Sequence, residues 1–378
     1  MRKIRITHIV KDDKFIDGPL SRFEEDSRFE NQAVLIVDSS DYKFKYIKNT
    51  DRIKLLYSKK MVRDALGRDD YDAVMFYSLT DYHIFKYIPQ DKIVIWWAWG
   101  WDIYGSKRFI DIPLYKLRTK EYLDKLSSSL WAKAKAFINT IPAVRLFRDG
   151  NRDEAIKRID FFQPVIHTEY ELMQKCPGFR AKEFYYPRAH FFEKWVSEDV
   201  PVHGNSIIIN HSATYTANHL DVWHDVRDFI PSDVTVYFPI NYGRKPYADM
   251  LSKMIVSNDD NICFLKEFLP REEYFRIVES CSYAVFGVLR EAAMGNIYRC
   301  IVSGVKLFLY KDSLVYQYLS ELGCVVYAIE EIGEGSFKTP LTRDQIEQNR
   351  RCLQKVQALV EKAREDAIGD IFKRLALK

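Results

Sequence analysis

One carboxylate beside a run of tryptophans is the first candidate for chemistry in this sequence. Residues 93–105 read IVIWWAWGWDIYG, so four of the seven tryptophans lie within six residues and Asp102 follows the last of them. Indole rings stack on flat ligands, and apolar surroundings raise the pKa of a carboxylic acid toward that of a general base. We therefore expect Asp102 to act as a base, with Trp99 and Trp101 against a flat ligand such as a carbohydrate or a nucleobase.

Asp102 also has a simpler interpretation, in which it caps the helix that follows it and Trp96 and Trp97 belong to the core. His8 is then the alternative base, because it lies near the end of the first predicted strand in the same half of the chain. A lone histidine is often structural, so both interpretations of His8 stay open.

A loop after a predicted strand of the second half is a candidate for binding an anion. Residues 210–214 read NHSAT and place His211 and Ser212 just before a predicted helix. Hydroxyl groups and free N–H groups at a helix start attract negative charge. Ordinary N-capping explains the same residues, so this loop alone does not decide the matter.

The loop at residues 290–296, which reads REAAMGN, carries a stronger signal. Gly295 at a helix start permits close approach of a phosphate, and Arg290 can neutralise its charge. Glu291 can accept hydrogen bonds from ribose hydroxyls, and Asn296 lies beside the same turn. The loop matches neither a dinucleotide fingerprint nor a Walker loop, which disfavours a dehydrogenase or a kinase.

Four further residues follow predicted strands or lie where the two halves meet. Glu267 and Phe268 can hold a nucleobase through backbone groups and a flat apolar wall, and Tyr242 can lean toward the same ligand. A simple turn explains Tyr242 equally well. Arg188, at the junction of the two halves, can pair with a diphosphate.

Short β-rich runs alternate with helical segments along both halves, which predicts parallel sheets built from βαβ units. The predicted strands of the first half are 4–10, 33–38, 73–77, 92–97, 164–167 and 183–186. Those of the second half are 206–210, 234–238, 262–265, 283–288, 305–310 and 325–328. The predicted helices are 113–137, 217–229, 246–257, 271–280, 294–303, 313–322 and a final segment from about 342 onward.

This order predicts two Rossmann-like domains that face each other across a cleft, with ligands at the carboxyl ends of the strands. We expect the N-terminal domain to span 1–193 and the C-terminal domain to span 205–341. The segment 342–378 is expected to be helical and to pack back on the N-terminal domain. Adjacent acidic pairs such as Asp69-Asp70 read as solvated turns, so we expect no metal.

Composition and charge indicate a globular protein in a reducing compartment. The six cysteines are all at least 18 residues apart and form no CxxC pair. We find no signal peptide and no apolar run of the roughly 20 residues that span a bilayer. Residues 101–150 hold ten Lys or Arg and five Asp or Glu, which suits an anionic membrane surface, a phosphate-bearing ligand or nucleic acid. We expect a cytoplasmic protein, peripheral to the inner face of the plasma membrane, that binds no nucleic acid.

The segment WWAWGWDIY at 96–104 resembles the tryptophan-rich segment of bacterial TDP-N-acetylfucosamine:lipid II N-acetylfucosaminyltransferases. The similarity recurs in order at His8, 115–118, 186–188, 209–219, 239–242, 267–274 and 290–297. The sequence departs from the family at residues 210–212, at Thr214 and at Ala293, where a glycine is expected.

The resemblance implies a GT-B fold and an inverting, metal-independent glycosyltransferase of the type that assembles enterobacterial common antigen. The donor would be a TDP- or UDP-linked sugar, such as an amino-deoxyhexose, that serves as substrate and not as cofactor. The domain over 205–341 would bind this nucleotide sugar, and the domain over 1–193 would bind the acceptor. The acceptor, lipid-linked or an oligosaccharide, would contact Trp99, Trp101 and Tyr104. Two alternatives stay open: a nucleotide-sugar epimerase of the non-hydrolysing type, and a non-enzymatic assembly protein that binds sugar nucleotides or membrane.

Overall fold

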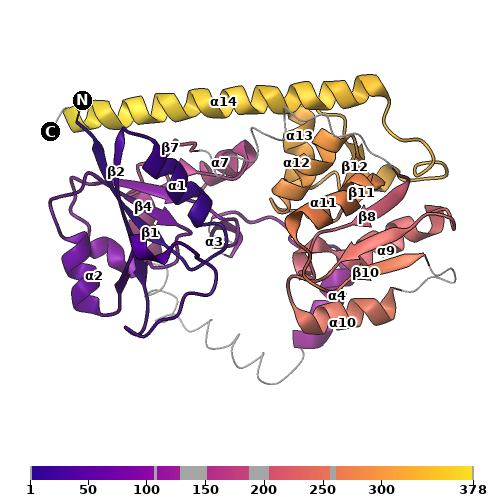
Figure 1. Cartoon of the computed structure of the whole chain (residues 1–378), viewed down its shortest axis with the longest axis horizontal. Coiled ribbons are helices and arrows are strands. Elements are labelled where there is room, and N and C mark those ends of the chain that lie inside the picture. The colour runs from indigo at the N-terminus through magenta and orange to yellow at the C-terminus, as the bar shows by residue number, and fades with distance from the viewer. Residues whose placement is uncertain (1, 106–108, 128–150, 187–203, 256–260, 377–378) are drawn as a thin grey trace. The chain divides into compact units, whose positions relative to one another are not determined.

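The structure is a computed structural model, and it describes residues 2–105, 109–127, 151–186, 204–255 and 261–376 (Figure 1). The chain divides into two compact units. Unit 1 comprises Met1–Asp111, Lys135–Phe191 and Ala358–Lys378, and unit 2 comprises Ile112–Ala134 and Phe192–Gln357. Each unit has its own parallel sheet and its own core.

Seven strands in the described part of unit 1 form a parallel sheet in the order β3-β2-β1-β4-β5-β6-β7. The strands are β1 (Ile4–Val10), β2 (Phe29–Ile36), β3 (Ile53–Leu56), β4 (Ala73–Tyr77), β5 (Ile93–Trp97), β6 (Phe161–Gln163) and β7 (Lys182–Glu183). The helices beside them are α1 (Asp17–Glu25), α2 (Lys59–Leu66), the 3-10 helix η2 (Tyr82–Tyr87), α3 (Trp101–Tyr104) and α7 (His167–Met173). Every residue of β4 and β5 is buried, as expected for central strands that are covered on both faces.

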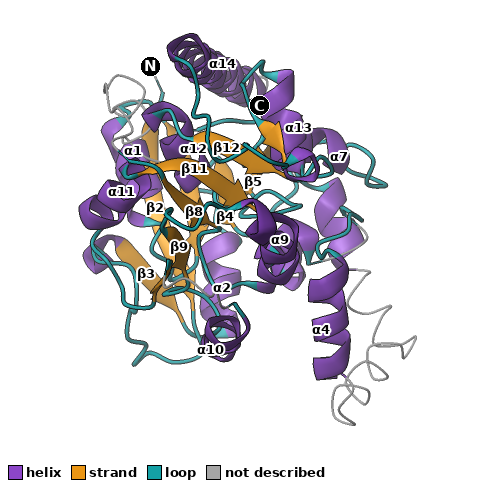
Figure 2. Cartoon of the chain, turned by 90° about the vertical axis from the view of Figure 1, so that its right-hand side faces the viewer, coloured by secondary structure: helices purple, strands orange, loops and turns teal. Residues whose placement is uncertain are grey.

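Six strands in the described part of unit 2 form a second parallel sheet in the order β10-β9-β8-β11-β12-β13. They are β8 (Ser206–Ile209), β9 (Val236–Pro239), β10 (Ile262–Leu265), β11 (Cys281–Phe286), β12 (Lys306–Leu309) and β13 (Tyr327–Ala328). The helices of this unit are α4 (Leu117–Ser127), α9 (His219–Val226), α10 (Lys245–Met254), α11 (Arg271–Glu279), α12 (Met294–Ser303) and α13 (Leu314–Glu321). Figure 2 shows the strands as inner layers with helices outside them.

Helix α4 belongs to unit 2, although it precedes most of that unit in sequence. Asp221 of α9 caps it: its carboxylate accepts hydrogen bonds from the N–H of Arg118 (2.7 Å) and from the N–H and hydroxyl of Thr119 (3.0 and 2.6 Å). Asn218 accepts from the N–H of Lys116 at 2.9 Å. These bonds satisfy the open N–H groups at the start of α4 and hold it against α9 (Figure 2).

The long helix α14 (Arg343–Ala376) contributes to both units. Within unit 2 the Asn349 amide bonds both the N–H and the carbonyl of Val325, at 2.6 and 3.2 Å. Within unit 1, Ala367, Ile368, Ile371 and Leu375 join the hydrophobic core. The units are therefore not continuous in sequence: residues 112–127 pack on unit 2, and the end of α14 packs on unit 1.

In unit 1, one predicted strand is wrong and one strand was not predicted. The strand predicted at 164–167 is wrong: β6 ends at Gln163, and α7 begins at His167. Pro164 has no N–H to give to a ladder, which ends the strand. The short strand β3 was not predicted, because it is only four residues long and alternates little.

Candidate functional site

Parallel α/β sheets bind ligands outside the carboxyl ends of their strands, where the strand order reverses. In unit 1 this switch point lies at β1, which pairs with β2 on one side and β4 on the other. In unit 2 it lies at β8, between β9 and β11. The loops that follow these strands are therefore the first places to look for a site in each unit.

Asp102 lies in the first turn of α3 and is 5% exposed. One carboxylate oxygen accepts from the indole Nε1 of Trp96 (2.7 Å) and the N–H of Leu79 (3.0 Å), and the other accepts from the N–H of Trp99 (2.9 Å). Burial raises the pKa of Asp102, and these hydrogen bonds partly offset the rise. The carboxylate thus ties the loops after β4 and β5 together, and its assignment as general base stays a prediction.

The tryptophans around Asp102 divide into core and surface residues. Trp96 and Trp97 are fully buried, as the simpler interpretation expected. Trp101 is 52% exposed, and Trp99 is half-buried with its ring edge-on to Phe15 at 6.4 Å. Tyr104 is buried, and its hydroxyl donates to Glu169 at 2.6 Å. Of the three predicted acceptor contacts, Trp99 and Trp101 therefore reach the surface and Tyr104 points inward.

His8 is completely buried in β1, and both ring nitrogens have partners. The amide of Asn31 donates to the carbonyl of Phe23 (2.9 Å), so its oxygen faces His8 Nε2 (2.9 Å) and the proton resides on Nε2. Nδ1 then accepts from the Tyr77 hydroxyl at 3.1 Å. Burial lowers the pKa of His8 to about 4, although the bond to Asn31 opposes this. The geometry is that of a neutral core histidine, and its assignment as a base stays a prediction.

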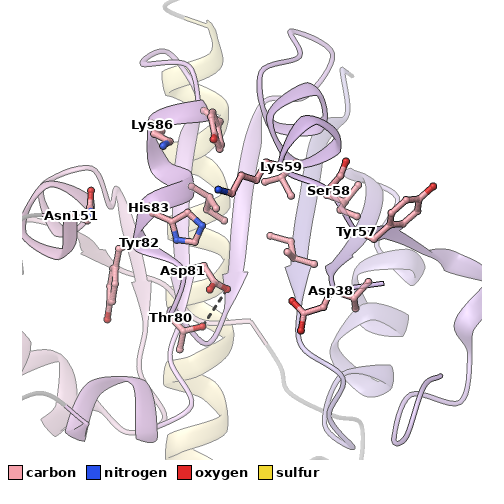
Figure 3. Close-up of a pocket in the computed structure, with 16 residues that line it drawn as sticks. Asp38, Tyr57, Ser58, Lys59, Thr80, Asp81, Tyr82, His83, Lys86 and Asn151 are labelled. Carbon is pink, nitrogen blue, oxygen red and sulfur yellow. Dashed lines mark hydrogen bonds between the residues drawn. The ribbon is translucent and has the colours of Figure 1, made fainter. Parts of the chain in front are cut away.

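An open pocket of about 620 Å³ lies in unit 1 at the carboxyl ends of β2, β3 and β4, beside the switch point (Figure 3). Its volume is typical of small-molecule sites. Apolar side chains from these strands, α2 and η2 line it together with charged ones. The residues that line it are Ile36, Val37, Asp38, Leu56, Tyr57, Ser58, Lys59, Val62, Thr80, Asp81, Tyr82, His83, Ile84, Lys86, Tyr87 and Asn151.

At the switch point of unit 2, the loops after β8 and β11 are joined. Asn210 adopts a left-handed backbone (φ 61°), and its side-chain oxygen accepts from the N–H of Gly287 at 2.9 Å. A Cβ on Gly287 would lie 2.4 Å from Val222 and 2.5 Å from the carbonyl oxygen of Ala217, so only glycine fits. This bond places the loops that carry His211 and Ser212, and Arg290 and Glu291, beside one another.

Within the loop after β8, Ser212 is 1% exposed and its hydroxyl lies 3.3 Å from that of Thr214. His211 is half-buried, with its ring 6.3 Å from that of Phe286. The carbonyl of Tyr242, in the loop after β9, accepts from the N–H of Ala213 at 2.6 Å. The loops after β8 and β9 are thereby held together.

The loop after β11 leads into the N-terminus of α12. Ala293 has a left-handed backbone (φ 62°), which explains why a glycine is expected there. Gly295 is exposed, and a Cβ built on it would meet nothing within 4 Å. Arg290 donates to the carbonyl of Glu291 at 2.5 Å, and Glu291 is 7% exposed. The start of α12 is therefore open on the side of Gly295, with a cation nearby in sequence.

Two exposed aromatic rings flank this edge of the sheet. Tyr242 is 55% exposed and Phe268, in the loop after β10, is 85% exposed. The amide of Asn241 donates to the carbonyl of Glu267 at 3.0 Å, which joins the loops after β9 and β10. The predicted donor residues of these four loops thus share one edge of unit 2. Arg188 lies outside the described residues.

Sequence reasoning missed Asn210, Asp38, Lys59 and Lys86. Asp38 was assigned to the end of a strand, and Asn210 likewise, although a polar residue at a strand end is the signal that should have marked both. The two lysines carry no pattern of their own, because only the packing of α2 against η2 brings them to one pocket.

No protein-family model matches the sequence. Among solved structures, the chain is similar to "Trehalose-6-phosphate from E. coli bound with UDP-2-fluoro glucose" (10% identity, TM-score 0.59, 97% of this chain and 98% of that chain). It is also similar to alpha,alpha-trehalose 6-phosphate synthase from Burkholderia multivorans (8%, 0.58, 100% and 98%). A third likeness is to an alpha-glucosyltransferase in complex with UDP and a 13-mer DNA (11%, 0.50, 98% and 96%).

At such low identity these likenesses bear on the fold. They confirm the predicted fold class: two parallel α/β units of the GT-B fold. Within the described residues, no helix has both the length and the apolar character to cross a membrane, and no group of three or more metal-ligating side chains comes together.

Proposed function

We propose that the protein is a glycosyltransferase that moves a sugar from a nucleotide-sugar donor to an acceptor. The observation that carries the proposal is the edge of unit 2 at β8 and β11, where four loops join and the N-terminus of α12 is open at Gly295. The GT-B fold supports it, and two of the similar structures are described with UDP or a UDP-sugar analogue.

The chemistry of this edge fits a nucleoside diphosphate. The N–H groups at the start of α12 carry positive partial charge, and the missing side chain of Gly295 lets a diphosphate approach them. Arg290 and Ser212 would contact its oxygens, with His211 and Asn296 beside it. Glu291 would accept from the ribose hydroxyls. The base would lie near Glu267, with Phe268 or Tyr242 against its face.

Transfer would proceed with inversion and without a metal. A base in unit 1 takes the proton from the acceptor hydroxyl, the oxygen attacks the anomeric carbon, and the bond to the diphosphate breaks. The electron pair leaves with the diphosphate, whose charge Arg290 and the α12 N-terminus stabilise. Asp102 is the first candidate for the base and His8 the second.

The finer proposal is transfer of an amino-deoxyhexose to a lipid-linked or glycan acceptor in bacterial surface polysaccharide assembly, as in the N-acetylfucosaminyltransferases. The protein would then act in the cytoplasm at the inner face of the plasma membrane. The basic excess of residues 101–150 supports this.

Gly295→Val is the test of the donor site. A valine side chain would fill the open face of α12, so we expect UDP or TDP to bind at least tenfold more weakly, as measured by calorimetry or by the thermal shift that ligand binding produces. Gly333→Val is the matched control, because a Cβ at Gly333 also meets nothing within 4 Å but lies outside these loops.

Equal nucleotide affinity in the two folded variants would contradict the donor site. Incubation of the parent protein with UDP-sugars then tests the reaction: sugar in the acceptor product supports transfer, whereas an isomerised donor formed without acceptor would point to the epimerase.

A further inference from the structure

The pocket between α2 and η2 in unit 1 is lined by two lysines and two aspartates, and its positive side chains are available to a ligand. Lys59 and Lys86 line it, and neither has an ion pair with any acidic side chain in the described residues. Of the two carboxylates in the lining, Asp81 lies 2.5 Å from Lys11 and is neutralised by it. The pocket therefore has a net attraction for anions.

Nitrogen-bearing side chains from two elements point into one part of the pocket. Figure 3 shows the ammonium group of Lys59 and the imidazole of His83 pointing toward one another from α2 and η2, with Lys86 on the same side as His83. N–H groups of Lys59, His83 and Lys86 can each donate to an oxygen of one phosphate, and hydrogen bonds to an ionised phosphate are shorter and stronger than neutral ones. A single exposed lysine would give no comparable selectivity.

The rest of the pocket suits the body of a sugar. Ile36, Leu56, Val62 and Ile84 provide apolar lining against which the face of a ring can lie. Asp38, at the end of β2, offers an exposed carboxylate that accepts hydrogen bonds from hydroxyl groups. The combination of a cationic end, an apolar lining and one acceptor matches a phosphorylated sugar better than an aliphatic chain.

We propose that this pocket binds the acceptor of the transfer reaction as a phosphorylated sugar, with Lys59, His83 and Lys86 holding the phosphate and Asp38 a hydroxyl group. The role of this ligand as acceptor rests on the proposed function. The pocket and the class of its ligand follow from residues of unit 1 alone. It differs from the acceptor contacts expected at Trp99 and Trp101, because neither tryptophan lines the pocket.

The test is calorimetric binding to the full-length protein, with glucose 1-phosphate, glucose and inorganic phosphate as probes. We expect glucose 1-phosphate to bind, glucose to bind much more weakly, and phosphate to lie between them. Lys59→Gln and Lys86→Gln should each weaken glucose 1-phosphate about tenfold, which corresponds to about 1.4 kcal/mol. Lys60→Gln is the matched control, since Lys60 is exposed on the same helix but does not line the pocket.

Binding of geranyl diphosphate distinguishes a lipid phosphate from a sugar phosphate as the ligand of the pocket. If geranyl diphosphate binds more tightly than glucose 1-phosphate and depends on Lys59, the phosphate contacts stand and the sugar assignment is overturned. If all three lysine variants bind glucose 1-phosphate as tightly as the parent does, the pocket itself is overturned. The same follows if the parent binds none of the phosphate probes.

Titration of the same samples with UDP tests the proposed function separately from the pocket. Loss of glucose 1-phosphate binding with UDP binding retained supports the pocket. Phosphate binding in a protein that binds no nucleotide and transfers no sugar would leave the pocket in place and remove the glycosyltransferase. Far-UV circular dichroism checks that the variants, all at exposed lysines, remain folded.

Discussion

At the scale of single residues, Asp102 shows how burial changes the meaning of a conspicuous side chain. Its position after the tryptophans suggested a base in an open cleft, yet three donors surround its carboxylate and leave it 5% exposed. A group in this setting positions the loops that bear Trp99 and Leu79. To act as a base it would have to gain access to the acceptor when the substrates bind.

Asp102→Asn separates these two roles. An amide NH₂ group in place of either oxygen would face at least one N–H donor, so we expect the free energy of unfolding to fall by about 1–3 kcal/mol. Urea unfolding measures it, and Asp64→Asn, at an exposed position, is the control. A variant with parental stability and a transfer rate lowered by about 10²–10⁴ would instead identify Asp102 as the base.

At the scale of elements, α4 depends on a cap from another helix. The side chains of Asp221 and Asn218 accept hydrogen bonds from the N–H groups of Lys116, Arg118 and Thr119. The start of α9 therefore provides the capping groups for α4. The ring of Tyr122 then packs near those of Tyr215 and Tyr247, at 6.3 and 5.9 Å. One face of α4, which lies within the basic segment 101–150, is thus anchored in unit 2.

Asp221→Ala should weaken this attachment. Loss of a cap costs about 0.5–2 kcal/mol, and we expect a fall in the free energy of unfolding toward the upper part of this range because Asp221 is 5% exposed. Hydrogen exchange of the Arg118 and Thr119 amides should accelerate as well. Asp228→Ala, at a side chain that is 76% exposed, should change neither quantity. Unchanged amide protection in Asp221→Ala would contradict the capping role.

At the scale of the whole molecule, each unit buries a histidine in its core. Burial lowers the pKa of His8 in unit 1 to about 4, and burial, with a smaller effect of His211, lowers the pKa of His219 in unit 2 to about 3. The unfolded chain takes up protons below about pH 6.5, where the folded protein does not. The free energy of unfolding must therefore fall as the pH drops from about 6.5 toward about 4.

His219→Phe tests this linkage. Both ring nitrogens of His219 are without a hydrogen-bond partner among the described residues, so phenylalanine can keep the edge-on contact with Tyr247. Below pH 6.5 the parent should lose free energy of unfolding more steeply than the variant. The two slopes should differ by about 1.4 kcal/mol per pH unit, which corresponds to one proton. The exposed His224, changed to Gln, serves as control. The idea fails if the variant shows the pH dependence of the parent.

The sequence by itself determined the fold class. Continuous apolar runs such as those of β4, β5 and β8 have few ways to be buried, and their alternation with helices leaves a parallel sheet as the solution. Strands 4–10, 73–77 and 262–265 and helix 294–303 were predicted to the residue. The predicted strand ends then identified the loops after β8, β10 and β11 as candidate binding loops, because the carboxyl ends of parallel strands lie at the same edge of a sheet.

Tertiary structure alone decided which polar residues face a ligand. Asp102 and His8 are conspicuous in sequence, but packing encloses them, whereas Lys59, His83 and Lys86 are ordinary in sequence and packing brings them to one pocket. The membership of α4 in unit 2 was also beyond the sequence, because it rests on contacts between residues about 100 positions apart. Local patterns fix elements, but exposure and convergence depend on long-range contacts that no local pattern encodes.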